Sequence, residues 1–101
     1  PEQVVVSPIV SEFNDYANEI TNKLKAAGLL AKADLRNEKI NYKIREHSVA
    51  KIPVIAIVGA KEKENGTITV RRLGSDKQTV MKVDEFIAAL VEEAKMPHIN
   101  E

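Results

Sequence analysis

An uninterrupted run of five apolar residues at positions 54–58, VIAIV, constrains the fold of this chain most strongly. Such a run is typical of a central strand that is covered on both faces, since a strand with one wet face alternates apolar and polar residues. Pro53 directly precedes the run and disfavours a helix in the residue before it. The run therefore predicts a strand in the middle of a sheet, with other elements packed on both sides.

Helical and strand patterns alternate on either side of this run. At positions 11–27 apolar residues recur at three- and four-residue spacing, and Gly28 follows where a helix can end in a left-handed conformation. The predicted strands are 3–7, 29–33, 54–58, 67–73 and 77–83, and the predicted helices are 11–27, 39–50 and one capped by Asp84. Residues 60–66, with four charges, an asparagine and a glycine, are predicted as a turn. The order β-α-β-α-β-β-β-α indicates an α/β fold with a mixed sheet and helices on both faces.

Length and charge limit the possible functions. A chain of 101 residues is long enough for one domain with its own core and too short for a second. Its 15 basic residues balance its 15 acidic residues, so a nucleic-acid site must come from local clustering of charge. The absence of cysteine excludes disulfides and cysteine-ligated zinc. The longest uncharged apolar run, 52–60, is far shorter than the roughly 20 residues of a membrane-spanning helix.

No catalytic or metal site is predicted in this chain. One histidine, His47, lies on an apolar helical stripe, and the other, His98, lies in a tail at 96–101 that we expect to be frayed. Acidic residues such as Glu62 lie within four residues of a lysine or arginine, which is typical of ion pairs rather than of calcium or zinc sites. The glycines are isolated, so the phosphate-binding patterns GxxxxGK and GxGxxG are absent.

The stretch 34–51, DLRNEKINYKIREHSVAK, combines cations, an amide, an aromatic residue and helical apolar spacing. It contains five lysines or arginines against three carboxylates, a local excess of two positive charges in a neutral chain. Ile40, Ile44 and His47 follow helical spacing, which predicts that this stripe faces a core. Lys39, Lys43 and Arg45 are predicted to lie nearer to solvent. On periodicity alone, such a pattern is most often a solvated helix face.

The sequence string itself is more specific than its periodicity. DLRNEKI, one residue, YKIRE, then a proline opening an apolar strand that ends in VG, closely resembles the C-terminal anticodon-binding domain of threonyl-tRNA synthetase, a class IIa aminoacyl-tRNA synthetase. The resemblance extends from residue 4 to about residue 95. It implies the class IIa anticodon-binding domain fold, a three-layer α/β/α sandwich of three helices and a five-stranded mixed sheet in the order 2-1-3-4-5 with strand 4 antiparallel.

The resemblance also implies a function. The domain would recognise the anticodon loop of threonine tRNA, whose anticodons end in G then U, while a separate catalytic domain attaches threonine with ATP, Mg²⁺ and a bound Zn²⁺. Residues 1–101 would be a single domain, ordered over about 3–95 and excised from the C-terminus of a cytoplasmic enzyme that dimerises through its catalytic part; alone, it would be monomeric. The alternatives are the related domain of a prolyl-, glycyl- or histidyl-tRNA synthetase, or a free-standing α/β module that binds proteins.

Five residues match positions that contact the anticodon in this family. They are Asn37, Arg45, Lys51, Glu62 and Arg71. An asparagine offers both a donor and an acceptor to a base edge, an arginine offers a planar fork of donors, and a glutamate only accepts. Because aromatic residues are only 4% of the chain, we expect bases to be read by their edges rather than by stacking.

The match departs from the family pattern at three positions. Lys51 stands where an arginine is frequent, which favours a phosphate contact over a bidentate base contact. Asn41 replaces a usual glycine, and Ala60 replaces an acidic residue, so the approach of the backbone to RNA is expected to differ there. Structural roles remain open for two of the matched residues: Asn37 as the cap of the second helix, and Arg45 as an ion-pair partner of a nearby glutamate.

Overall fold

The computed structural model describes residues 2–95. The predicted tail at 96–101, which includes His98, lies outside the described residues. In chain order the elements are β1 (Val4–Pro8), the 3₁₀-helix η1 (Ser11–Phe13), α1 (Asn14–Ala26), β2 (Ala31–Ala33), α2 (Ile40–Val49), β3 (Val54–Val58), α3 (Ala60–Asn65), β4 (Thr67–Arg72), β5 (Gln78–Lys82) and α4 (Val83–Lys95).

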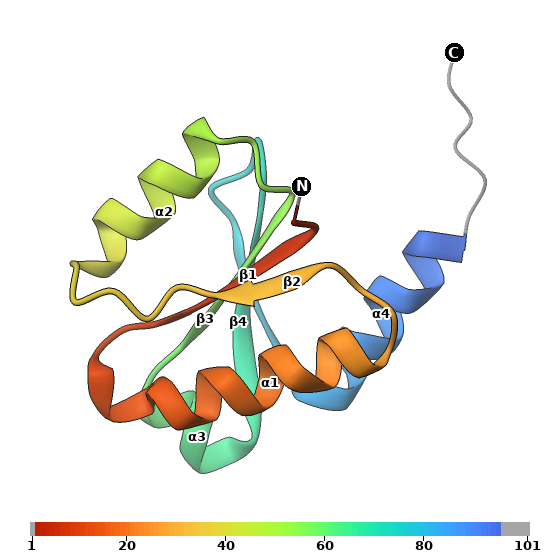
Figure 1. The fold of residues 1–101 in the computed structure, drawn as a ribbon, viewed down its shortest axis with the longest axis horizontal. Helices are drawn as coiled ribbons and strands as arrows, with labels where there is room; N and C mark the ends of the chain where they lie inside the picture. Colours follow the sequence, from red (N-terminus) through yellow and green to blue (C-terminus); the bar gives the residue numbers. More distant parts are fainter. Residues whose placement is uncertain (1, 96–101) are drawn as a thin grey trace.

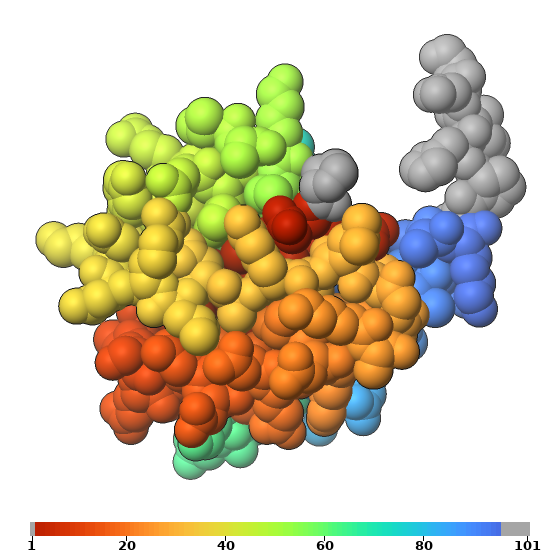
Figure 2. All heavy atoms as spheres, in the orientation of Figure 1, coloured from red at the N-terminus to blue at the C-terminus, as the bar shows by residue number. Residues whose placement is uncertain are grey.

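The five strands form one mixed sheet in the order β2-β1-β3-β4-β5. β1 is parallel to both β2 and β3, whereas β4 is antiparallel to its neighbours β3 and β5. The expected strand order and the reversed fourth strand are therefore confirmed. α1 and α4 cover one face of the sheet and α2 covers the other, as Figure 1 shows. In Figure 2 the edge strand β2 and the segment 34–39 form a strip of surface between α1 and α2.

The alternation of side chains along the strands divides the sheet into two differently covered faces. Val54, Ala56 and Val58 of β3 join the main core, which α1 and α4 complete with residues such as Ile20 and Phe86. Burial of each large apolar side chain in this core contributes about 1.5–3 kcal/mol. On the opposite face Ile55 and Ile57 lie beneath the single helix α2. One ten-residue helix cannot cover a whole five-stranded face, and part of this face remains open near β4 and β5.

The predicted turn at 60–66 is wrong, because residues Ala60–Asn65 form the short helix α3. Glu62, in its first turn, accepts a hydrogen bond from the backbone N–H of Gly59, and Gly66 ends the helix with a φ of 69°. Alanine, lysine and glutamate are good helix formers, so termini of this kind can hold even a short helix. The described residues thus contain four α-helices and a 3₁₀-helix instead of the expected three helices.

The final helix also begins two residues earlier than predicted, since Asp84 was expected to cap it, whereas Val83 is its first residue and Asp84 lies in its first turn. There the carboxylate of Asp84 interacts favourably with the positive end of the helix dipole. Within residues 2–95 no helix is both long and apolar enough to cross a membrane. The same residues contain no group of three or more histidine, cysteine, aspartate or glutamate side chains placed to hold a metal ion.

Candidate nucleic-acid interface

A groove that is open to solvent lies between α2 and the β4–β5 hairpin, with a volume of about 500 Å³. It is lined by Asn41, Arg45, Ser48 and Val49 from α2, with Arg71 from β4 and Gln78 from β5. A second hollow of about 240 Å³ adjoins it, and Glu62 lies in this second hollow. Asn41, Ile44 and Gln78 line both spaces, so we treat them as one site, the α2 groove.

Local periodicity places the polar side chains along this groove. Asn41, Arg45 and Ser48 are four and three residues apart, so they form one stripe on the surface of α2. On the sheet, Arg71 of β4 lies directly opposite Gln78 of β5 in the antiparallel register. Residues opposite each other in such a ladder point to the same face, which here is the face covered by α2. The helix and the sheet therefore each direct one arginine into the groove.

The side chains of Arg45 and Arg71 are available to a ligand. Within residues 2–95 the arginines that form ion pairs are Arg36 and Arg72, and neither of them lines the α2 groove. Arg45 is exposed and Arg71 is half-buried. The alternative that Arg45 forms an ion pair with a nearby glutamate is wrong within residues 2–95, where Glu46 pairs with Arg36 instead. Two guanidinium groups thus give the groove a positive character in a chain with no net charge.

Glu62 is fixed in position by hydrogen bonds at both carboxylate oxygens. Oε1 accepts the backbone N–H of Gly59 at 2.9 Å, and Oε2 accepts the hydroxyl of Thr69 at 2.9 Å. The hydroxyl of Tyr16 on α1 also donates to the backbone carbonyl of Glu62 at 3.1 Å. Each carboxylate oxygen can accept a further hydrogen bond, so Glu62 remains a possible acceptor for a ligand N–H while it stabilises the start of α3.

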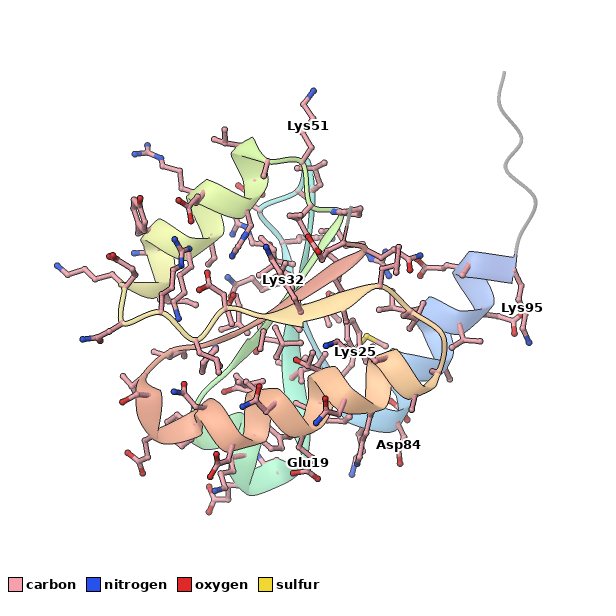
Figure 3. All side chains as sticks on the ribbon, in the orientation of Figure 1. Glu19, Lys25, Lys32, Lys51, Asp84 and Lys95 are labelled. Carbon is pink, nitrogen blue, oxygen red and sulfur yellow. The ribbon has the colours of Figure 1, made fainter. Side chains whose placement is uncertain are left out.

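The other two predicted residues flank the groove at the two ends of α2. Asn37 is exposed in the segment between β2 and α2. Its predicted capping role is wrong, since Lys39 is the N-cap of α2 and no side chain caps this helix. Lys51 is exposed beyond the other end of α2, and its side chain points away from the body of the molecule (Figure 3). A helix of ten residues is about 15 Å long, so these two residues are far apart.

The expectation that Lys43 faces solvent is wrong, because its side chain is only 1% exposed. Its Nζ donates to the carbonyl of Asp34 at 2.9 Å and to that of Pro8 at 3.3 Å. These carbonyls lie at the C-terminal ends of β2 and β1, so Lys43 joins α2 to two parallel strands. Burial lowers the pKa of this amine from its ordinary value. Lys43 is thus a structural residue whose ammonium group is occupied by the fold and does not face solvent.

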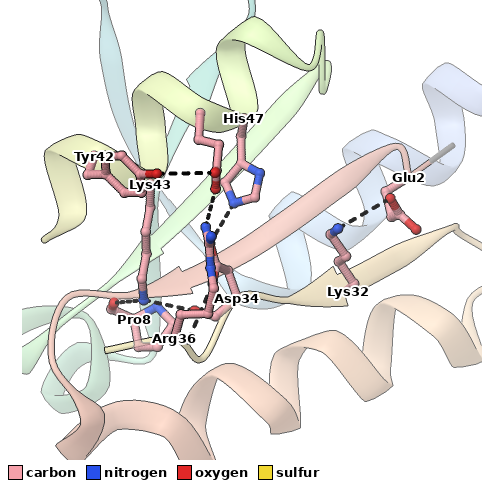
Figure 4. A network of polar contacts seen from close by, with 9 residues as sticks. Glu2, Pro8, Lys32, Asp34, Arg36, Tyr42, Lys43 and His47 are labelled. Atoms are coloured by element: carbon pink, nitrogen blue, oxygen red, sulfur yellow. Dashed lines mark hydrogen bonds and ion pairs between the residues drawn. The ribbon is translucent and has the colours of Figure 1, made fainter. Parts of the chain in front are cut away.

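A second polar network holds the segment 34–39 against α2 (Figure 4). The buried carboxylate of Asp34 accepts hydrogen bonds from Arg36 at 2.8 and 2.7 Å and from His47 Nε2 at 2.7 Å. Arg36 also contacts Glu46 on α2. The hydrogen bonds that Arg36 donates to Asp34 hold the pKa of this carboxyl group well below its usual range. His47 is therefore a hydrogen-bonded core histidine, and the network fixes the segment that presents Asn37.

Four polar residues of the groove were not among the predicted contacts: Asn41, Ser48, Thr69 and Gln78. Asn41 could have been identified from the sequence, because it is four residues before Arg45 and shares its helical stripe. Gln78 could not, because its place opposite Arg71 depends on the register of the β4–β5 hairpin. A shift of that register by one residue would turn Gln78 to the other face of the sheet.

Comparison with known sequences supports a specific family. The family model described as an anticodon binding domain matches residues 3–93. The chain is 57% identical over 100 residues to the threonine–tRNA ligase of Chelativorans sp. (strain BNC1), and 60% identical over 97 residues to that of Mesorhizobium japonicum. These alignments cover 99% and 96% of the chain. The chain spans only 15% of the length of either relative.

Solved structures share the fold at lower sequence identity. The RNA-binding domain of threonyl-tRNA synthetase from Cryptosporidium parvum Iowa II superposes with a TM-score of 0.89 at 23% identity, covering 96% of this chain and 24% of that one. Histidyl-tRNA synthetase from Nostoc sp. PCC 7120 gives a TM-score of 0.86 at 19% identity over 94% of this chain and 23% of its own. The matching family model, the sheet order and the relatives that align with nearly the whole of this chain agree, and the chain therefore belongs to the anticodon-binding domain family.

Proposed function

We propose that this chain is the C-terminal domain of a threonine–tRNA ligase and that its α2 groove binds the anticodon loop of threonine tRNA. One observation carries the proposal: Arg45 and Arg71, whose guanidinium groups have no ion-pair partner in residues 2–95, line the same open groove from a helix and a strand. Convergent guanidinium groups suit phosphates and the acceptor-rich edges of unpaired bases.

The composition of the groove favours reading base edges over stacking. Its described lining contains no aromatic side chain, while Ile44 and Val49 supply apolar surface against which the flat face of a base can pack. Arg45 and Arg71 act as donors, and Glu62 acts as an acceptor for a base N–H. Its two internal hydrogen bonds hold Glu62 in a fixed position, which reduces the entropy lost when a ligand binds.

The footprint extends beyond the groove at both ends of α2. Asn37, on the segment held by Asp34 and Arg36, contacts the loop from one end. Lys51 projects from the other end and attracts phosphate, with Lys39 as a further exposed cation. Lys43 takes no part, because its ammonium group is buried and hydrogen-bonded to two carbonyls.

The rest of the parent enzyme supplies the chemistry. In this proposal the parent is a cytoplasmic homodimer whose catalytic part uses ATP and Mg²⁺ and holds a Zn²⁺, none of which involves the residues of this domain. The parent joins threonine to the far end of the tRNA, and the α2 groove ensures that the tRNA is the correct one. The relatives named above, of which this chain spans 15%, support a parent of this kind.

A binding experiment with short RNA hairpins tests the proposal. Fluorescence anisotropy would give the Kd of the 101-residue chain for an anticodon stem-loop ending in G then U, and for two loops that differ by one base. The first has G then G, as in proline anticodons, and the second has A then U. We expect each single change to weaken binding about tenfold or more, since each mismatched base typically costs about 1–3 kcal/mol in a sequence-specific site.

NMR shift mapping would locate the same complex on the protein. We expect amide shifts to change in α2, in the 59–62 segment and around Arg71, and to stay constant in α1 and α4, which lie on the other face of the sheet. Equal affinity for all three loops, or shifts confined to α1 and α4, would contradict the proposed function.

A further inference from the structure

Each arginine of the α2 groove has a carboxamide beside it. Asn41 is four residues before Arg45 on α2, the spacing that brings two helical side chains together. Gln78 is directly opposite Arg71 in the β4–β5 ladder, where side chains of neighbouring strands lie side by side. Both carboxamides line both hollows of the groove, so they lie where the two spaces meet.

These two carboxamides are exposed and available for a ligand. Among the groove-lining residues, the side-chain hydrogen bonds formed within residues 2–95 are those of Glu62 and Thr69. Asn41 and Gln78 are both exposed, and neither is needed to satisfy a buried polar group. Neither residue has a structural role in the described residues that would account for its presence in the groove.

The chemistry of an amide differs from that of the charged groups around it. A guanidinium group only donates hydrogen bonds and an ionised carboxylate only accepts them, whereas a carboxamide does both through adjacent atoms. A guanidinium group is satisfied by phosphate oxygens as well as by the acceptors of a base edge, and its phosphate contacts add affinity without distinguishing between bases. A carboxamide is satisfied in full only by a base edge that places a donor next to an acceptor. All four bases have such an edge, but the order differs: guanine and uracil pair a ring N–H donor with an exocyclic oxygen acceptor, whereas adenine and cytosine pair an exocyclic amino donor with a ring nitrogen acceptor.

We propose that Asn41 and Gln78 are specificity-determining residues of the α2 groove, reading the edges of unpaired bases while Arg45 and Arg71 supply most of the affinity. This inference rests on the proposed function and adds the residues that discriminate between bases. A base with the wrong order of donors and acceptors leaves a carboxamide atom unpaired inside the complex. The loss of that hydrogen bond is the source of discrimination.

The experiment compares discrimination ratios rather than single affinities. The ratio is the Kd for a loop with one changed base divided by the Kd for the loop ending in G then U. We expect Gln78→Met and Asn41→Ala each to lower this ratio about tenfold for at least one changed base, consistent with the value of a good base contact. Gln78→Glu, which keeps the shape but loses the donor, should lower it as well.

Matched controls keep the interpretation specific. Thr79→Val changes the neighbouring residue of β5, whose side chain points to the opposite face, and Asn22→Ala removes an exposed amide from α1. Both should leave the ratio unchanged, whereas Arg45→Ala should weaken binding to all loops by a similar factor. Circular dichroism of each variant confirms that the fold is retained.

The possible failures can be told apart. If the unmodified chain discriminates between the loops and the three amide variants keep its full ratio, the inference is wrong and the proposed function stands. If the unmodified chain binds all loops equally, the proposed function fails and the inference fails with it.

Discussion

Arg71 and Arg72 are consecutive residues of β4, and their side chains lie on opposite faces of the sheet. Arg72 donates two hydrogen bonds to Glu93 of α4, at 3.0 and 2.7 Å, whereas Arg71 lines the α2 groove. Alternation along a strand makes this division unavoidable. The strand therefore contains one arginine with a structural partner and, next to it, one that is available to a ligand.

This pair allows a matched test of the proposed interface. We expect Arg71→Ala to weaken binding of the threonine anticodon stem-loop by about 1–3 kcal/mol. Arg72→Ala should leave RNA binding unchanged and lower the free energy of unfolding by less than about 1 kcal/mol, because its ion pair with Glu93 is half-exposed. Anisotropy titrations and urea unfolding measure the two quantities, and equal losses of affinity would reject the assignment of Arg71.

The sequence predicted the sheet well because its strands are governed by local patterns. The five apolar residues at 54–58 form the central strand β3 with the predicted bounds. The strand order, by contrast, came from the resemblance to a family rather than from spacing. Burial of residues such as Ile55 and Ala56 on opposite faces of β3 then follows from simple alternation.

Two of the wrong predictions, for Lys43 and for residues 60–66, relied on charge rather than on spacing. Lys43 is three residues after Ile40 and four before His47, so helical spacing also fits a buried position for it, but its charge favoured the surface in the prediction. Two backbone carbonyls at the ends of parallel strands made its burial possible. Likewise, the charged segment 60–66 forms a helix in which Glu62 reaches back to the N–H of Gly59, a local capping contact that a count of charges does not show.

Lys51 provides a test in which stability and binding move in opposite directions. It has a φ of 63°, and the N–H groups of Lys51 and Ile52 donate to the carbonyls of Ser48 and His47, both at 3.0 Å. This arrangement ends a helix most favourably with glycine. We expect Lys51→Gly to raise the free energy of unfolding by up to about 1 kcal/mol while weakening RNA binding.

The salt dependence of binding identifies what Lys51 contacts. If it meets one phosphate, Lys51→Gly should reduce the slope of log K against log salt by about 0.7. The control is Lys25→Gln on α1, which removes a positive charge and should leave the slope unchanged. Glutamine is used there because glycine would also destabilise the helix. An unaltered slope in Lys51→Gly would exclude Lys51 from the footprint.

The Asp34 network predicts a specific response to acid. The hydrogen bonds from Arg36 hold the pKa of Asp34 well below its usual value near 4. At pH values between the lowered and the usual pKa, the unfolded chain binds more protons than the folded one, so stability falls with falling pH. The contribution of Asp34 is fully present above the usual pKa and is lost as pH falls through the lowered one.

We expect Asp34→Asn to lower the free energy of unfolding at pH 7 by about 1–2 kcal/mol, because part of the network is exposed and screened. Its stability should also decline less steeply than that of the unmodified chain between pH 4 and 2. Urea unfolding at a series of pH values measures both effects. Asp76→Asn, at an exposed position, is the control. If the stability of Asp34→Asn falls between pH 4 and 2 as steeply as that of the unmodified chain, the network is not the source of the acid sensitivity.

Glu62 has a structural role and a proposed binding role, and two substitutions separate them. Glu62→Ala leaves the N–H of Gly59 and the hydroxyl of Thr69 without their acceptor, so we expect a loss of about 1–3 kcal/mol of stability. Glu62→Gln retains one side-chain oxygen and should cost less stability.

If Glu62 only supported α3, removing its negative charge in Glu62→Gln would strengthen RNA binding through reduced repulsion. If it accepts a base N–H, Glu62→Gln should instead weaken binding to the cognate loop, while Glu64→Gln, on the same helix but outside the groove, would not. Because the two roles predict changes of opposite sign, one pair of anisotropy titrations decides between them.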